Sequence, residues 1–443
     1  MTTYLIKNIE IINDGKSVFN DVMIKNGRFE KIAPQINIKE SYVEINGDGL
    51  KLLPGVIDDQ VHFREPGLTH KACIETESKA AVAGGVTSFM EMPNTKPAAT
   101  SLTLLEEKFQ IAAKNSWTNY SFFLGASNDN LEEIKRAEQY CKNICGIKIF
   151  MGSSTGNLLV DNFVSLEQIF ASSPLLIATH CEYEPLIQTH LEKYAKTLKD
   201  IHYHPIIRDE EVCYQSSLRA IQLAQKTGAR LHILHISTAK ELSLFSNLKP
   251  LAEKQITAEV CVHHLHFTSA DYGRLGNLIK CNPAIKNSLH KTALWQALLN
   301  GTLDVVATDH APHTWEEKMQ DYNQAPAGVP LVQHSLVLML KYVEQGIITI
   351  EQMVEKMCHN PAICFKVKER GFIREGYWAD AVIIKREPWV VLPENIYYKC
   401  GWSPFLNETF PYKVWSCFVN GSLQYNQGKF YQNHSGQRLE FER

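Results

Sequence analysis

From residue 55 onward, eight short apolar runs alternate with longer segments of helical periodicity. The runs span residues 55–61, 86–92, 120–125, 146–151, 175–180, 231–236, 257–263 and 304–309. Segments with helical spacing lie between several of them, including residues 102–114, 131–141 and 209–227. Strands that alternate with helices indicate βαβ units and a parallel sheet. Eight such units predict an α/β fold, a (β/α)8 TIM-like barrel of roughly 250 residues or more.

The two ends of the chain follow a different pattern. Residues 4–12, 22–25 and 29–32 are β-rich segments separated by turns, and residues 379–385 and 414–425 resemble them. We therefore expect the two ends to pair as one accessory β domain. The expected division places residues 1–53 and 366–443 in this domain and residues 54–365 in the barrel, which the length of 443 residues allows.

Composition narrows the class of protein. A formal net charge of −3 gives no basic surface for nucleic acid, and no segment approaches the roughly 18 apolar residues of a membrane span. Residues 1–10 lack the apolar centre and cleavage site of a secretory signal. The 11 cysteines are scattered without a CxxC pair. We expect a cytoplasmic globular protein with reduced cysteines and a small-molecule substrate.

Polar side chains end most of the eight apolar runs, and in a parallel barrel these ends meet at the rim that carries active sites. They are Gln60, His62, Arg64, Asn94, Lys148, His180, His235, His263, His264 and Asp309. A lone His in an apolar run is more often a core residue, but convergence at one rim favours a metal site. His232 keeps the core interpretation. Because adjacent strand residues point to opposite faces, we expect only one of His263 and His264 to face the site.

These residue types suit a hydrolytic metal site. Imidazoles and a carboxylate are suitable ligands for Zn²⁺, which activates water when one coordination position is open. Asp309 would accept the proton of that water and return it to a leaving nitrogen. Lys148 is exceptional, because a cationic amine beside a metal is electrostatically unfavourable. Either CO₂ converts Lys148 into an anionic bridge between two metals, or Lys148 pairs with a nearby carboxylate.

Six motifs resemble those of the amidohydrolase superfamily, and within it of the dihydroorotases in the cyclic-amidohydrolase branch. They are His62-Phe63-Arg64-Glu65-Pro66-Gly67, Met92-Pro93-Asn94-Thr95, Gly146-Ile147-Lys148, Thr179-His180-Cys181-Glu182, Leu234-His235-Ile236-Ser237 and Ala307-Thr308-Asp309-His310-Ala311-Pro312-His313. The resemblance covers most of the chain, from Leu53 to Asp380. It implies a metal-dependent enzyme of pyrimidine biosynthesis that reversibly hydrolyses dihydroorotate to N-carbamoyl-L-aspartate.

The resemblance also implies a role for each site residue. Lys148 would be N6-carboxylated and bridge the metals of a site with one or two Zn²⁺ ions, with His180 and His235 on one ion. His62 and Asp309 would attend the other ion. The implied substrate-binding residues are Arg64, Asn94, Asn282 and His313, together with the backbone near Ala327-Gly328. A homodimer is implied as well, and association with aspartate transcarbamoylase is possible for a relative of this kind.

Arg64 discriminates among the relatives on physical grounds. Dihydroorotate carries an exocyclic carboxylate, and a guanidinium beside Asn94 can bind it through two parallel hydrogen bonds. Hydantoin and allantoin rings carry no such group, and sequences of the hydantoinase or allantoinase type usually lack this arginine. Arg64 therefore favours a dihydroorotase. The alternative is a surface arginine paired with Glu65.

Gln60 departs from the family pattern, in which His-x-His stands where this chain has Gln60-Val61-His62. A neutral amide is a weak zinc ligand. Three outcomes are open: a two-metal site of reduced affinity, a one-metal site, or a non-catalytic dihydroorotase-like partner of aspartate transcarbamoylase. Retention of the other motif residues favours an active enzyme. Another cyclic-amide hydrolase, such as a dihydropyrimidinase, hydantoinase or allantoinase, is the alternative activity.

Overall fold

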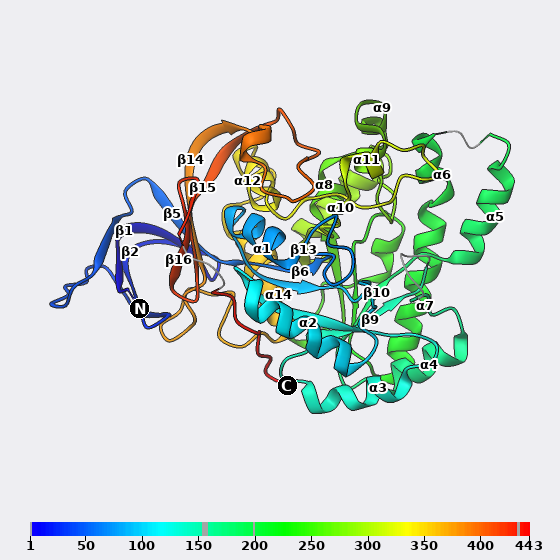
Figure 1. Cartoon of the computed structure of the whole chain (residues 1–443), viewed down its shortest axis with the longest axis horizontal. Coiled ribbons are helices and arrows are strands. Elements are labelled where there is room, and N and C mark those ends of the chain that lie inside the picture. Colours follow the sequence, from blue (N-terminus) through cyan, green and yellow to red (C-terminus); the bar gives the residue numbers. More distant parts are fainter. Residues whose placement is uncertain (1, 153–157, 198–199, 432–434) are drawn as a thin grey trace.

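The structure, a computed structural model, describes residues 2–152, 158–197, 200–431 and 435–443. Eight parallel strands form its centre: β6 (Val56–Val61), β7 (Val86–Glu91), β8 (Asn119–Gly125), β9 (Gly146–Phe150), β10 (Ile177–His180), β11 (Leu231–Ile233), β12 (Ile256–Cys261) and β13 (Val305–Ala307). Each strand pairs with the next along the chain. A parallel bridge between Val61 and His310, with the His62 amide donating to the His310 carbonyl at 2.7 Å, joins the first strand to the end of the last. The predicted (β/α)8 barrel is confirmed (Figure 1).

Helices follow most of the barrel strands. They are α1 (Ile74–Ala83), α2 (Leu102–Asn115), α3 (Leu131–Arg136), α4 (Phe163–Ser172), α5 (Glu184–Tyr194), α6 (His204–Ile207), α7 (Glu210–Thr227), α8 (Val262–His266), α9 (Tyr272–Leu275), α10 (Ser288–Leu299), α11 (Trp315–Lys318), α12 (Ser335–Glu344), α13 (Ile350–Val354) and α14 (Asn360–Phe365). Local sequence sets their ends: the Asp209 carboxylate accepts from the first amides of α7, and Ser101 does the same for α2. The expected helix over residues 131–141 is shorter, because α3 tightens into a 3-10 helix at Ala137–Tyr140.

A second sheet contains both ends of the chain. Its strands are β1 (Tyr4–Asn13), β2 (Lys16–Lys25), β3 (Arg28–Ala33), β4 (Val43–Asn46), β5 (Leu50–Pro54), β14 (Ala381–Val390), β15 (Thr409–Val419), β16 (Ser422–Asn426) and β17 (Lys429–Phe430). β5 pairs antiparallel with β14, with Leu53 opposite Val382. The blue N-terminal strands of Figure 1 therefore lie beside the orange and red C-terminal strands, which confirms the expected accessory sheet. The exact domain boundaries stay predictions.

A partly buried carboxylate ties this sheet to the barrel helices. Glu408, just before β15, lies 3.1 Å from the Lys341 ammonium of α12 and 3.5 Å from His266 Nε2 of α8. Burial would raise the pKa of Glu408, but the His266 ring and the Lys341 ammonium hold it at about 2. The ionised form is therefore the one that the folded chain stabilises.

Two expectations about composition can be compared with the described residues. All eleven cysteines are described and are free thiols, most of them buried, as expected. Among the described helices, none has the length and apolar character needed to cross a membrane.

Candidate active site

A pocket of about 270 Å³ opens at the carboxyl ends of the barrel strands. Its lining residues are Gln60, His62, Arg64, Asn94, Lys148, Phe150, His180, His235, Asn282, Asp309, Ala311, Pro326, Ala327 and Gly328. Nine of the ten predicted site residues are in this lining, and only His313 is not. The fold thus brings residues from strands far apart in the sequence to one place, while their chemical roles stay predictions.

Three of these residues have a left-handed backbone conformation. The φ angles are 68° at Arg64, 41° at His235 and 49° at Asp309. Side chains other than glycine rarely adopt such angles, which cost of order 1–3 kcal/mol each and persist where the surrounding structure imposes them. All three residues follow the end of a barrel strand, β6, β11 or β13. Strain concentrated at these three positions is typical of a functional site.

A pair of imidazoles forms one half of the pocket floor. His180 Nδ1 lies 3.1 Å from His235 Nε2, and His180 Nε2 contacts the Glu182 carboxylate at 3.0 Å. Burial would raise the pKa of Glu182, but the Arg208 guanidinium and the His180 ring hold it at about 2. A carboxylate on one ring nitrogen of His180 directs the lone pair of the other nitrogen toward His235. Two nitrogens that face each other at this distance fit a shared cation.

Lys148 lies beside this pair. Its side chain is buried, and its ammonium is 4.6 Å from the centre of the Phe150 ring. Burial lowers the pKa of Lys148 to about 7, so the neutral amine, which is the form that reacts with CO₂, is accessible near neutral pH. The described residues include no carboxylate in an ion pair with Lys148, so the alternative of a paired lysine gains no support.

His62, Asp309 and Gln60 form the other half. His62 Nδ1 lies 2.7 Å from the Asn94 side-chain oxygen, which places the proton on Nδ1 and leaves Nε2 to face Asp309 Oδ1 at 3.1 Å. Gln60 Nε2 donates to the same Asp309 oxygen at 3.0 Å, while Gln60 Oε1 faces the Cys261 thiol at 3.7 Å. The amide oxygen of Gln60 is therefore turned away from His62. Gln60 acts as a hydrogen-bond donor to Asp309 in this structure.

Arg64 is a buried cation in the pocket wall, only 4% exposed. Its Nε donates to the Pro312 carbonyl at 3.1 Å, and Nη2 lies 3.1 Å from His313 Nε2. The alternative pairing with Glu65 is wrong, because the Glu65 carboxylate accepts from the Ile74 amide at the start of α1. Burial lowers the pKa of Arg64 to about 10, so it stays charged at neutral pH. Among the described residues, no carboxylate forms an ion pair with it.

His313 supports the pocket from behind rather than lining it. His313 Nδ1 lies 2.9 Å from the Lys71 ammonium and 3.5 Å from the Glu317 carboxylate. Nε2 lies 3.0 Å from the carbonyl of Ala327, a lining residue, and 3.1 Å from Arg64 Nη2. Asn282, in contrast, lines the pocket, and its buried Oδ1 has no hydrogen-bond partner among the described residues.

Lys318 is a residue that sequence reasoning missed. It is fully buried at the end of α11, and its ammonium donates to the carbonyls of Lys280, Pro326 and Gly328 at 3.1, 3.0 and 2.8 Å. The Lys280 ammonium donates to two further carbonyls of the same segment, residues 322–328. Two lysines thus fix the segment that forms one wall of the pocket. A lysine in a polar stretch of sequence gives no signal of this role.

His263 and His264 correct another expectation. β12 ends at Cys261, and both histidines lie in α8, where the alternation of a strand does not apply. Their rings are 4.1 Å apart, and neither lines the pocket. The expectation that one of them faces the site was therefore wrong. His232 is fully buried inside the barrel, in agreement with its core interpretation.

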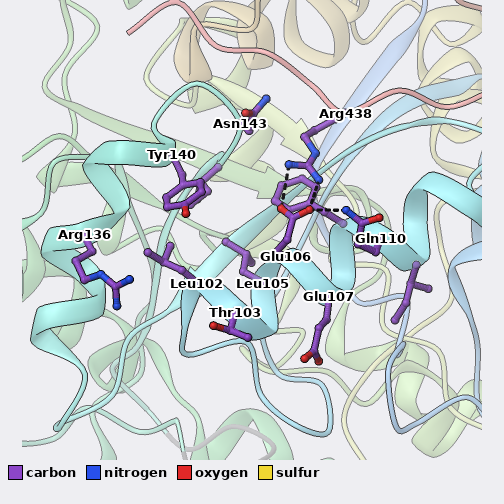
Figure 2. A pocket seen from close by; sticks show the side chains of 13 residues that line it. Leu102, Thr103, Leu105, Glu106, Glu107, Gln110, Arg136, Tyr140, Asn143 and Arg438 are labelled. Carbon is purple, nitrogen blue, oxygen red and sulfur yellow. Dashed lines mark hydrogen bonds and ion pairs between the residues drawn. The ribbon is translucent and has the colours of Figure 1, made fainter.

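A larger cavity of about 570 Å³ lies outside the barrel, between α2, the segment after α3 and the C-terminal segment (Figure 2). Of its two acidic residues, Glu106 and Glu107, the first accepts from both Arg438 and Gln110. Of the described residues that line this cavity, none is a predicted site residue. The rim pocket is therefore the candidate active site.

Comparisons with known proteins agree with this geometry. The sequence matches the amidohydrolase family over residues 52–422. It is 32% identical to a dihydroorotase of Methanosarcina acetivorans, over 92% of this chain and 89% of that one. It is 34% identical to a dihydroorotase of Carboxydothermus hydrogenoformans, over 91% of this chain and 94% of that one.

Solved structures of the same fold include an L-hydantoinase (dihydropyrimidinase) from Arthrobacter aurescens, with a TM-score of 0.93 and 25% identity over 99% of this chain and 100% of that one. The dihydropyrimidinase from Brevibacillus agri has a TM-score of 0.89 at 23% identity, with both chains covered completely. The chain therefore belongs to the amidohydrolase family, in its dihydroorotase branch, and is a metal-dependent cyclic amidohydrolase.

Proposed function

We propose that this chain catalyses the reversible hydrolysis of dihydroorotate to N-carbamoyl-L-aspartate, a step of pyrimidine biosynthesis. The observation that carries the proposal is the buried Arg64 in the pocket wall, which has no carboxylate partner among the described residues. Leaving a guanidinium buried without an anion is costly. The carboxylate of dihydroorotate would supply that anion, whereas an uncharged hydantoin ring would not.

The donors in the pocket fit divalent metal ions such as Zn²⁺. His180 and His235 would hold one ion together with Lys148, which we propose is carboxylated on its amine. His62 and Asp309 would attend a second ion, in contact with the same Lys148 carboxylate. Because the Gln60 oxygen is turned away from His62, we propose that Gln60 is not a ligand and that this second ion is the more weakly held. A bound ion would activate water and polarise the ring carbonyl.

The residues of the chain itself would then do three things. Arg64 would bind the substrate carboxylate, and Asn282 and Asn94 would hold its polar edge, so that the ring amide faces Asp309. Asp309 would take a proton from the water that adds to the ring carbonyl. When the ring C–N bond breaks, Asp309 would return this proton to the leaving nitrogen, which gives a new carboxylate and a carbamoyl group.

A second candidate activity is hydrolysis of an uncharged cyclic amide, as in a dihydropyrimidinase, hydantoinase or allantoinase. The observation that favours it is the close structural likeness to the hydantoinase of Arthrobacter aurescens. This likeness covers the barrel that all such enzymes share, and a common fold can carry different substrate preferences. Arg64 is the feature that distinguishes the two activities.

A substrate panel with metal analysis tests the proposal. Purified protein would be assayed with dihydroorotate, N-carbamoyl-L-aspartate, dihydrouracil, hydantoin and allantoin, and its zinc content measured. We expect turnover of the first two only, and its loss in the Asp309→Asn variant. Faster turnover of an uncharged ring than of dihydroorotate would establish the second candidate activity, hydrolysis of an uncharged cyclic amide. Absence of both turnover and metal would favour a non-catalytic partner of aspartate transcarbamoylase, which co-purification can check. Light scattering would test the implied homodimer.

A further inference from the structure

The interior of the barrel, below the rim pocket, contains a separate group of metal-ligating side chains. We propose that Asp59, His232 and Glu259 bind a structural Zn²⁺ ion there. The three residues come from β6, β11 and β12, and their ligand atoms all lie within 4.8 Å of one another. All three side chains are fully buried. The rim residues assigned above take no part in this group.

The placement follows from the topology of the barrel. β6 is not a neighbour of β11 or β12 in the sheet, so Asp59 can meet the other two residues only across the barrel interior. Below the group lies the apolar side chain of Phe365, whose ring centre is 5.4 Å from that of His232. Above it lies Cys261, whose thiol contacts both Glu259 Oε1 at 3.2 Å and Gln60 Oε1 at 3.7 Å. The group is thus a layer between the apolar floor and the rim.

Four atoms of the group have no hydrogen-bond partner among the described residues. They are both carboxylate oxygens of Asp59, Oε2 of Glu259 and Nε2 of His232. Buried polar atoms are nearly always satisfied, so four of them in one place point to a missing partner. One oxygen from each carboxylate together with His232 Nε2 would give a tetrahedral zinc ion three protein ligands, and its fourth position would take a water molecule.

The tautomer of His232 fits this assignment. Its Nδ1 lies 2.7 Å from the Thr257 hydroxyl oxygen, and that hydroxyl lies 3.3 Å from the Leu231 carbonyl to which it can donate. The hydroxyl therefore accepts from Nδ1–H, and the lone pair of Nε2 points at the two carboxylates. A histidine ligand of a metal commonly has its other ring nitrogen fixed in this way.

The distances also match a small ion. His232 Nε2 is 3.2 Å from Asp59 Oδ2 and 3.6 Å from Glu259 Oε2. Two tetrahedral ligands, each about 2.0 Å from a zinc ion, lie about 3.3 Å apart. Calcium needs six to eight oxygen ligands at longer distances, so one imidazole nitrogen and two carboxylates do not suit it.

The charge balance favours a divalent ion over a proton. If His232 were an imidazolium between two ionised carboxylates, the group would carry one net negative charge on side chains that are all fully buried. A divalent ion with a neutral imidazole makes the group neutral. Burial of a net charge is strongly unfavourable, and a bound ion removes it.

The proposed ion would also support the rim from below. Glu259 Oε1 accepts from the backbone amide of His235 at 3.1 Å, next to the residue's strained backbone. An ion on Glu259 Oε2 would fix the orientation of this carboxylate. We therefore expect the ion to stabilise the fold and to hold His235 in place without contacting substrate.

Zinc stoichiometry in a chain with a disabled rim tests the proposal. The rim variant His62→Asn/His180→Asn/His235→Asn, expressed without a polyhistidine tag and treated with chelator in the native state, should retain about one zinc per chain. Adding His232→Gln should remove that zinc and lower the melting temperature. Adding His202→Gln, at an exposed histidine outside the group, should change neither.

A folded rim variant without zinc, or a rim variant with His232→Gln that keeps its zinc, would overturn the proposal. If the His232→Gln variants do not fold, anomalous diffraction from wild-type crystals at the zinc edge decides instead. A peak between Asp59, His232 and Glu259 is expected, separate from any peak at the rim. The absence of that peak would overturn the proposal.

Discussion

Replacing Arg64 by glutamine should abolish the preference of this enzyme for a substrate that carries a carboxylate. Arg64 is buried and lines the pocket, its Nε is engaged by the Pro312 carbonyl, and its Nη2 lies 3.1 Å from His313 Nε2. Glutamine keeps a polar side chain at the same left-handed position but removes the charge and the paired donors. The change therefore tests the proposed recognition of the substrate with little change in backbone strain.

The expected magnitude follows from the burial of this residue. Loss of one partner of a buried, hydrogen-bonded charge pair typically costs about 2 to 5 kcal/mol. At about 1.4 kcal/mol per tenfold, kcat/KM for dihydroorotate should fall by roughly 30-fold to several thousand-fold. The fall should come mainly through KM if the contact is equally strong in the ground and transition states. Arg64→Lys keeps the charge without the fork of donors and should give an intermediate loss.

Steady-state kinetics on two substrates would check this reasoning. Ring opening of dihydroorotate and of dihydrouracil, which lacks the carboxylate, is followed for wild type and both variants, with zinc content measured in parallel. Arg386→Gln is the matched control, because Arg386 is an exposed arginine of the accessory sheet paired with Glu344. An equal loss for both substrates would refute the carboxylate role of Arg64 and indicate a general defect in the pocket.

Three further changes have defined outcomes. Gln60→His should raise the affinity for the zinc ion at His62 and Asp309 by about tenfold or more, because imidazole is a better zinc ligand than an amide. Zinc retention during titration with a chelator measures this, and unchanged retention would contradict the prediction. Lys318→Met should lower kcat/KM by roughly 10- to 100-fold without loss of zinc, because the pocket wall formed by residues 322–328 loses the hydrogen bonds that fix it. Lys318→Arg should recover part of the lost activity. Glu408→Gln should lower stability at pH 7 by roughly 1 to 3 kcal/mol. Because the pKa of Glu408 is lowered to about 2, the stabilisation that its carboxylate contributes is complete above about pH 4.5 and declines as the pH falls toward 2. The free energies of unfolding of wild type and variant, measured in urea, should therefore converge in acid. A difference that stays constant with pH would contradict this prediction.

The barrel and most of the rim could be predicted because both depend on local pattern. The eight apolar runs are short, and most of them end in polar residues. The ends of parallel barrel strands meet at one rim, so this rule alone brings Lys148, His180 and Asp309 together. The pairing of the chain ends was also predictable, since both ends have the same β-rich pattern beside a barrel that has no open edge.

The parts that were missed depend on where strands stop and on long-range contacts. β12 ends two residues before the end of its apolar run, so His263 and His264 lie in a helix and the expected alternation fails. The left-handed backbone at Arg64 has no sequence signal, because arginine does not favour it. Asp59 follows Asp58 in the sequence and looks like part of a polar strand end, yet only the closed barrel places it against His232.

The pairing of β5 with β14 affects how the chain folds during synthesis. Residues 55–380 separate the two strands, so at typical rates of translation β5 waits roughly 15 to 65 seconds for its partner. During that time the hydrogen-bonding edge of β5 is open and its apolar Leu52 and Leu53 lack their final neighbours, which is a hazard for aggregation. The barrel strands are therefore synthesised while the accessory sheet is still incomplete. Chaperone dependence of the nascent chain should end only when the ribosome has passed residue 390.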